Sequence, residues 1–194
     1  MNLPNFLTIM RVLMTFAAAV LLCVNVKYFA LISFVVYCLA GATDWFDGYL
    51  ARKYDIVTTF GKFMDALSDK IMVVAMFMTL FALGLYEEWT IPALFCAIIS
   101  IAREFFVSGI RMLASHKGIV LAAEKVGKYK AGFQMYSIGA IILAWSLKTE
   151  FDADNSALYF MAFYSGIVTL ALSTVLSLWS GFSYGTRYSC LLKE

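Results

Sequence analysis

The sequence reads Asp44-Trp-Phe-Asp47-Gly48-Tyr-Leu-Ala51-Arg52 and, after eight further residues, Gly61-Lys-Phe-Met-Asp65-Ala-Leu-Ser-Asp69. These two runs place four carboxylates at the ends of strongly apolar segments. A carboxylate at the centre of a membrane helix costs roughly 2.5–3.5 kcal/mol, and less near the interface. Because ionisable groups are rare in such surroundings and usually functional, the four aspartates mark the candidate site.

The spacing of these aspartates predicts that they converge. Asp44 and Asp47 are three residues apart, and Asp65 and Asp69 are four apart, so each pair would share one face of a helix. The short connection over 53–60 would make the two helices antiparallel neighbours. Four carboxylates in one place repel one another and need cations. Arg52 supplies a single charge, so we expect Mg²⁺ or Mn²⁺ as well, and two shared ions would suit a clamp on a phosphoryl group.

The composition indicates an integral membrane protein. The chain has 194 residues, 62% of them hydrophobic, and its mean hydropathy is +0.82. A soluble core of this size could not bury so much apolar surface, and the long apolar runs favour helices over a barrel. We expect one all-α domain over 1–194, with a short interfacial segment at 1–10 and six spanning helices, at 6–24, 28–45, 61–85, 89–113, 131–147 and 157–181. We assign no chemistry to 181–188, which would end the last span.

The distribution of Lys and Arg predicts the orientation. With the N-terminus inside, most cations fall on the cytoplasmic side, whereas Lys27 and Lys148 fall outside. The positive-inside rule therefore puts both termini and the aspartates at the cytoplasmic face. The first apolar segment could instead be a signal peptide, but Arg11 lies inside it and no convincing cleavage site follows.

The complete pattern, Asp-x₂-Asp-Gly-x₂-Ala-Arg-x₈-Gly-x₃-Asp-x₃-Asp, resembles the signature of the CDP-alcohol phosphotransferases, and every fixed position is filled. Segments 2–11 and 103–111 resemble the branch of that family that uses glycerol 3-phosphate. Ala66 and Ser68 depart from that branch, which often has Pro and Ala there, but neither position should carry a ligand. The resemblance implies transfer of the phosphatidyl group of CDP-diacylglycerol to glycerol 3-phosphate, with release of CMP, by a homodimer in a bacterial-type inner (cytoplasmic) membrane.

The resemblance also implies roles for single residues. Asp44, Asp47 and Asp65 would bind metal, and Asp69 would be a ligand or lie just beyond, acting as general base for the acceptor hydroxyl. The residues expected to hold CDP-diacylglycerol are Gly48, Ala51, Arg52, Thr58 and Gly61. Glycine inside a helix costs about 1 kcal/mol relative to alanine. Close approach of the backbone to the nucleotide would explain both glycines, and helix–helix packing by small residues is the alternative.

A second group of charged residues lies further along the chain, at Arg103, Arg111, Lys125 and Lys128. Arg103 interrupts an apolar run and needs an anion, which we do not expect from Glu104 because adjacent helical residues face different ways. A phosphorylated acceptor such as glycerol 3-phosphate would serve. The resemblance favours Arg111 and Lys128 first, and then Arg103. Lys125 and Lys130 could instead contact lipid headgroups at the cytoplasmic surface.

Two alternatives to this function remain open at the level of sequence. The same chemistry could use phosphatidylglycerol, as in cardiolipin synthesis, or inositol phosphate or serine, because the nucleotide pattern does not separate acceptors. The aspartates could also bind a permeating cation in a transporter. Against a transporter, the acids cluster toward one face of the membrane, and Arg52 would repel cations.

Overall fold

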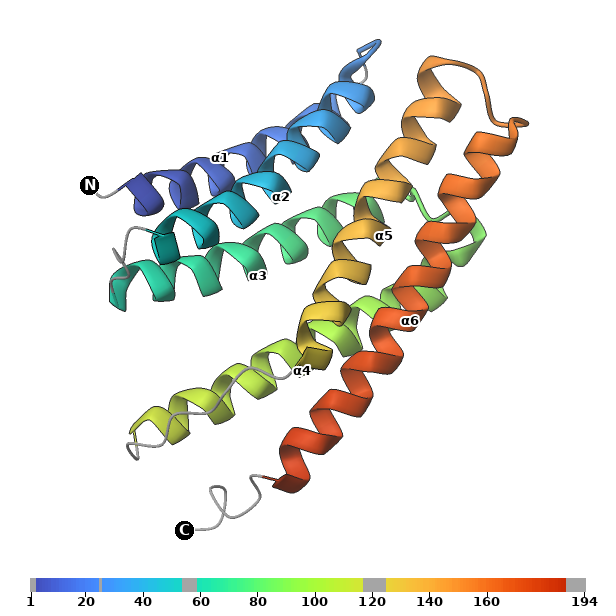
Figure 1. Ribbon diagram of the computed structural model, residues 1–194. Coiled ribbons are helices and arrows are strands. Elements are labelled where there is room, and N and C mark those ends of the chain that lie inside the picture. Colours follow the sequence, from blue (N-terminus) through green and yellow to red (C-terminus); the bar gives the residue numbers. More distant parts are fainter. Residues whose placement is uncertain (1–2, 25, 54–58, 117–124, 188–194) are drawn as a thin grey trace.

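The computed structural model describes residues 3–24, 26–53, 59–116 and 125–187. Within these ranges, side chains are described except at 3–5, 44–53, 59–60, 62, 116 and 125. All regular elements of the described chain are helices, as the sequence predicts (Figure 1). Its elements are α1 (Leu3–Cys23), α2 (Phe29–Lys53), α3 (Thr59–Ala82), the 3₁₀ turn η1 (Glu87–Trp89), α4 (Thr90–His116), α5 (Lys125–Glu150) and α6 (Ala157–Arg187).

The six α-helices coincide with the six predicted segments, although several are longer. α1 begins at Leu3 and runs without interruption to Cys23, so residues 3–10, which the sequence places at the interface, belong to the first long helix. α2 continues past the apolar part of its sequence to Lys53, and α6 continues to Arg187. Within the described residues, three segments are long and apolar enough to cross a membrane, Phe6–Cys23, Glu87–Ser115 and Ala157–Arg187, and Phe29–Thr43 is a shorter apolar helix.

The helices form two groups that α5 joins. α1 packs against α2 and α3, and α6 packs against both α4 and α5 (Figure 1). α5 also contacts α2, and α3 makes smaller contacts with α4 and α5. Met76, Phe77 and Leu80 of α3 and Ile138 and Ile141 of α5 are buried where the groups meet. The core cluster includes residues from all six helices, so the two groups share one core.

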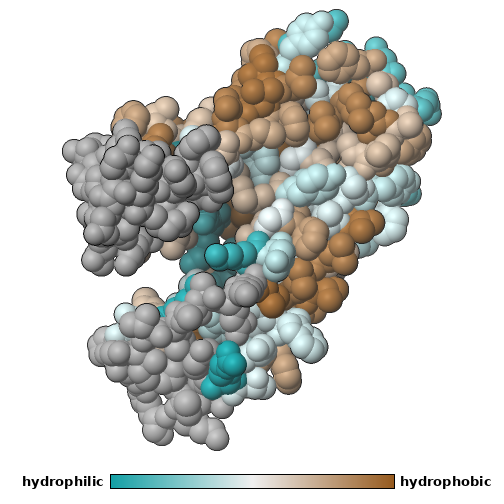
Figure 2. Space-filling model, viewed as in Figure 1, coloured by the Kyte–Doolittle hydropathy of each residue, from teal (hydrophilic) through white to brown (hydrophobic). Residues whose placement is uncertain are grey.

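Large apolar side chains also cover the outside of the molecule. Met161, Trp179 and Phe182 of α6 are all at least 70% exposed, and Val20 of α1 and Met112 of α4 are exposed as well. Figure 2 shows broad apolar areas on the face in view. Water would not favour so large an apolar surface, but a lipid environment does not penalise it. The described structure is that of an all-helical membrane protein.

A carboxylate on α5 holds the start of α2. The backbone N–H of Ala30 donates to Glu150 Oε1 at 2.7 Å, and the N–H of Leu31 donates to Glu150 Oε2 at 3.2 Å. Ser146 Oγ donates to the same carboxylate at 2.8 Å. The first N–H groups of a helix lack partners within it and carry partial positive charge, so an acid placed there stabilises the helix. Glu150 thereby links the two helix groups at the end of α2 remote from the aspartates.

Small residues allow α5 and α6 to approach closely. Ser137 Oγ donates to the carbonyl oxygen of Gly166 at 2.6 Å. A Cβ atom built at Gly166 would lie 3.0 Å from Ile141 Cδ1 and 3.3 Å from Ala140 Cβ. Membrane helices commonly pack through such positions, because a small residue lets two backbones come together.

We therefore expect Gly166→Leu to lower the thermal unfolding temperature of the detergent-solubilised protein by several degrees. Overpacking typically costs about 1–3 kcal/mol. Gly109→Leu on α4 is the matched control, because a Cβ atom there meets nothing within 4 Å. Equal unfolding temperatures for the two variants would contradict this account of the α5–α6 interface.

Candidate active site

The residues of the aspartate pattern lie at the end of α2 and the start of α3. Asp44, Asp47, Gly48, Ala51 and Arg52 belong to the last turns of α2, and their side chains lie outside the described set. Thr58 lies outside the described residues, as does the side chain of Lys125. The described part of the site therefore comprises Gly61, Asp65 and Asp69 of α3, together with the residues that they contact.

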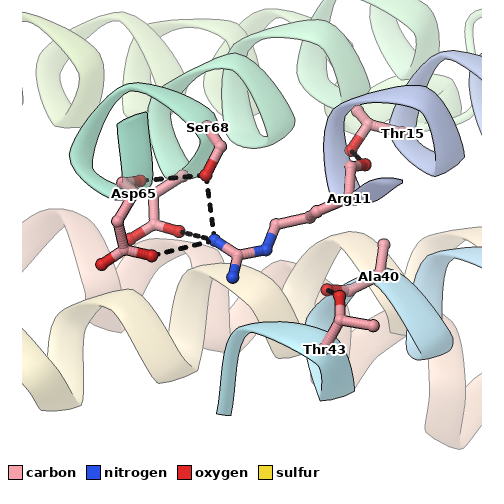
Figure 3. Close-up of polar contacts among 7 residues, drawn as sticks. Arg11, Thr15, Ala40, Thr43, Asp65 and Ser68 are labelled. Atoms are coloured by element: carbon pink, nitrogen blue, oxygen red, sulfur yellow. Dashed lines mark hydrogen bonds and ion pairs between the residues drawn. The ribbon is translucent and has the colours of Figure 1, made fainter. Parts of the chain in front are cut away.

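Arg11 of α1 is bound to Asp65 and Asp69, the two aspartates of the pattern whose side chains are described (Figure 3). Its Nη1 atom lies 2.9 Å from Asp69 Oδ1 and 3.3 Å from Asp65 Oδ1, and it donates to Ser68 Oγ at 2.9 Å. Asp65, Ser68 and Asp69 are spaced i, i+3 and i+4, so they share the face of α3 that meets α1. The Arg11 side chain is 0% exposed, whereas the side chains of Asp65 and Asp69 are 53% and 55% exposed.

The sequence predicts the need for a cation among the aspartates but does not identify Arg11. The available signal is that Arg11 is a charge inside an apolar segment and needs an anion there. The local sequence cannot say which anion, because Arg11 and Asp69 are 58 residues apart. Only the packing of α1 against α3 brings them together.

A cavity of about 340 Å³ begins at Asp69 and extends between α3, α4, α5 and α6. Arg103, Arg111 and Lys128 lie on its wall with Asp69, so one cavity contains three of the four residues predicted to bind the acceptor. Figure 2 shows hydrophilic side chains at the base of a hollow on this side of the molecule. The arrangement places cations and one carboxylate around a space that is large enough for a small phosphorylated molecule.

Two polar residues of α6 hold the arginines of α4. Arg103 Nη2 donates to Ser180 Oγ. Arg111 Nη2 donates to Tyr184 OH at 3.0 Å, and the Arg111 guanidinium lies 5.5 Å from the centre of the Tyr184 ring. Tyr184 belongs to the segment 181–188, for which the sequence predicts no chemistry, but the structure places it on the cavity wall. The sequence contains no local signal for this role, because the partner lies on another helix.

The surroundings of Lys130 and Glu104 also differ from those that the sequence predicts. Lys130 is 2% exposed and forms an ion pair with Glu104, and both residues lie on the cavity wall. Lys130 is therefore not a solvated headgroup contact as the sequence suggests. Glu104 does face the same cavity as Arg103, because the cavity is broad enough to meet two adjacent residues of α4. This ion pair connects α4 to α5 across the cavity.

Residues 1–179 match the family model described as CDP-alcohol phosphatidyltransferase. The chain belongs to this family. It is 32% identical over 183 residues to a protein of Rickettsia typhi, covering 94% of each chain, and 33% identical over 186 residues to one of Haemophilus influenzae, covering 94% of this chain and 91% of the other. A Bacillus subtilis protein is 39% identical over 109 residues, covering 56% of this chain and 53% of the other. All three carry the name CDP-diacylglycerol–glycerol-3-phosphate 3-phosphatidyltransferase.

The described aspartates fit the divalent metal on which this family generally depends. Asp65 and Asp69 already direct one oxygen each at a single cationic group, and both side chains are half exposed, so an ion can reach them. Carboxylate oxygens are the ligands that Mg²⁺ and Mn²⁺ prefer. Within the described part of the chain, no three acids, histidines or cysteines lie close enough together to hold a metal ion. Further ligands must come from elsewhere, and Asp44 and Asp47 are the candidates that the sequence supplies.

The contact between Arg11 and Asp69 can be tested by a double-mutant cycle on thermal unfolding in buffer without divalent cations. We expect Arg11→Gln and Asp69→Asn each to destabilise the protein, and the double variant to be less destabilised than the sum. The coupling should be about 1 kcal/mol, because Asp69 is half exposed and water screens the pair. Arg187→Gln, at the exposed end of α6, is the control and should show no coupling to Asp69→Asn. Additive effects of Arg11→Gln and Asp69→Asn would contradict the contact.

Proposed function

We propose that this protein transfers the phosphatidyl group of CDP-diacylglycerol to glycerol 3-phosphate, forming phosphatidylglycerol phosphate and CMP. The observation that carries the proposal is that Asp69 lies on the wall of the cavity that also contains Arg103, Arg111 and Lys128. A carboxylate that can accept a proton thus faces a space lined with groups that bind phosphate. The names of the relatives agree with these substrates.

The acceptor phosphate would be held first by Arg111 and Lys128, and then by Arg103. Arg111 is already oriented by Tyr184, so little side-chain freedom is lost when it pairs with phosphate. Held in this way, the acceptor would extend its hydroxyl toward Asp69. Positioning of the two reactants is a large part of catalysis in phosphoryl transfer, since it removes the entropic cost of bringing them together.

Asp69 would act as the general base. It takes the proton of the acceptor hydroxyl while the hydroxyl oxygen forms a bond to the phosphorus that carries the diacylglycerol. The bond between that phosphorus and the bridging oxygen breaks, and CMP leaves with the bridging oxygen. Arg11 fixes the orientation of Asp69 and Asp65 from the protein side, since its guanidinium contacts both carboxylates.

The metal and nucleotide residues complete the proposed site. Asp65 and Asp69, together with Asp44 and Asp47, would hold one or two ions of Mg²⁺ or Mn²⁺, and the bound charge would offset that of the diphosphate. The residues proposed to hold the CDP-diacylglycerol are Gly48, Ala51, Arg52, Thr58 and Gly61. Lys125 would add positive charge near the acceptor phosphate.

The proposed setting of the enzyme is a bacterial-type inner membrane, crossed by all six helices as a single domain of 194 residues. The exposed apolar side chains on several helices support contact with lipid. The bias of Lys and Arg supports cytoplasmic termini and a cytoplasmic active site. We also propose a homodimer, by analogy with the family.

The reaction can be tested by offering the purified, Mg²⁺-loaded protein CDP-diacylglycerol with one acceptor at a time. We expect CMP release with glycerol 3-phosphate but not with phosphatidylglycerol, inositol phosphate or serine. Asp69→Asn is the control and should lose nearly all of the activity. CMP release with another acceptor would support the phosphatidyl transfer but contradict the assignment of glycerol 3-phosphate as the acceptor. No CMP with any acceptor, from folded protein, would overturn the function and favour cation binding.

The acceptor pocket predicts a specific kinetic effect of Arg111→Ala. The KM for glycerol 3-phosphate should rise at least tenfold, because a charged hydrogen bond to phosphate is lost. The KM for CDP-diacylglycerol should stay within about twofold of the wild-type value. Arg187→Ala, which removes an exposed arginine of α6, is the control and should leave both constants unchanged. An effect of Arg111→Ala confined to CDP-diacylglycerol would refute the assignment.

A further inference from the structure

Gln134 of α5 is a buried amide on the wall of the cavity. The residue is 0% exposed, and neither its Nε2 nor its Oε1 atom has a hydrogen-bond partner among the described residues. Leaving one buried polar group unpaired typically costs about 1–3 kcal/mol, and most such groups in native proteins have partners. An amide with both ends unpaired beside a substrate cavity is therefore unusual and suggests a ligand.

Three cations of the cavity wall differ from Gln134, because each is paired with another side chain of the protein. Lys130 pairs with Glu104, Arg103 with Ser180, and Arg111 with Tyr184. These contacts fix the cations in place for an anionic group. The amide of Gln134 carries no charge and has no such contact with any described residue, so its role differs from that of the phosphate-binding groups.

The position of Gln134 relative to the cations indicates which part of the acceptor it would meet. Lys128 is exposed at the start of α5, and Gln134 is six residues further along the same helix. Six residues correspond to about 9 Å along the helix axis. An acceptor with its phosphate near Lys128 and Arg111 would therefore direct its carbon chain along the cavity wall toward Gln134.

The chemistry of the amide matches a hydroxyl group. A glutamine donates through its NH₂ group and accepts through its carbonyl oxygen, and a hydroxyl both donates and accepts. In glycerol 3-phosphate, one hydroxyl reacts and the other, on the middle carbon, stays free. The amide atoms lie just behind the cavity surface, so contact requires a change of rotamer, and such hydrogen bonds often form only in the substrate complex.

We propose that Gln134 binds the unreactive hydroxyl on the middle carbon of the acceptor and so selects acceptors that carry it. This inference rests on the proposed function. A site built to hydrogen-bond a hydroxyl rejects an analogue that lacks it, because the buried polar group of the protein is then left unpaired. Gln134 is thus a specificity-determining residue of the acceptor site, separate from the residues that hold the phosphate.

The test compares kcat/KM for glycerol 3-phosphate and for 3-hydroxypropyl phosphate, which has the reactive hydroxyl and the phosphate but no middle hydroxyl. The wild-type protein should prefer glycerol 3-phosphate at least tenfold. Gln134→Met, which keeps the length and volume of the side chain, should bring the ratio close to one, through loss of activity with glycerol 3-phosphate. A purely structural role of Gln134 would lower activity with both acceptors and leave the ratio unchanged.

Ser137→Ala is the matched control, because Ser137 is a buried polar residue of α5 whose hydroxyl bonds to Gly166 instead of lining the cavity. It should keep the wild-type ratio. If Gln134→Met does not fold, Gln134→Asn withdraws the amide by one methylene and should also lower the ratio. A wild-type ratio near one, or an unchanged ratio in the Gln134 variants, would overturn the inference while leaving the proposed function intact. CMP release with neither acceptor would overturn both.

Discussion

The contact between Arg11 of α1 and the carboxylates of α3 is the constraint on which the site depends. A guanidinium that is fully buried in an apolar helix must be paired, since an uncompensated buried charge is strongly destabilising. Asp65, Ser68 and Asp69 supply three acceptors from one face of α3. Because all three bonds use the same nitrogen atom, a shift of α1 along α3 by one turn would break them together. The contact therefore fixes both the register of the two helices and the direction of the aspartates.

The second group of helices forms its own polar framework around the cavity. Ser180 and Tyr184, four residues apart on α6, hold Arg103 and Arg111 of α4. Lys130 of α5 forms an ion pair with Glu104 of α4. α4 packs mainly on α6, so the space beside α3 and α5 stays open, and the ion pair crosses its edge. The cations of the cavity are thus arranged before any anion arrives, and such preorganisation favours both binding and catalysis.

These two frameworks meet at Asp69. It contacts Arg11 on one side and faces the cavity on the other, so it belongs to the aspartate pattern and to the acceptor pocket at once. In the proposed reaction the nucleotide lipid approaches from α2 and α3, and the acceptor approaches from α4, α5 and α6. A base at the boundary can reach a hydroxyl held on one side and direct it toward a phosphorus held on the other. Gln134 belongs to the acceptor side, where it would bind the hydroxyl that neither reacts nor carries charge.

The sequence by itself determined the helical fold and the family, and it predicts which residues form the site. Apolar runs of sufficient length define the helices, and the i, i+4 spacing puts Asp65 and Asp69 on one helix face. The position of Arg103 in an apolar run indicates that it binds an anion. These signals are local, because helix periodicity is set by neighbours in the chain. Only the tertiary structure decided that Arg11 pairs with the aspartates, that Tyr184 orients Arg111 and that Lys130 is buried. It also decided that Gln134 has no hydrogen-bond partner among the described residues. Each of these contacts depends on which helices pack together and on how they are aligned. The contacting residues are tens of positions apart in the chain, so no local sequence pattern encodes the contact.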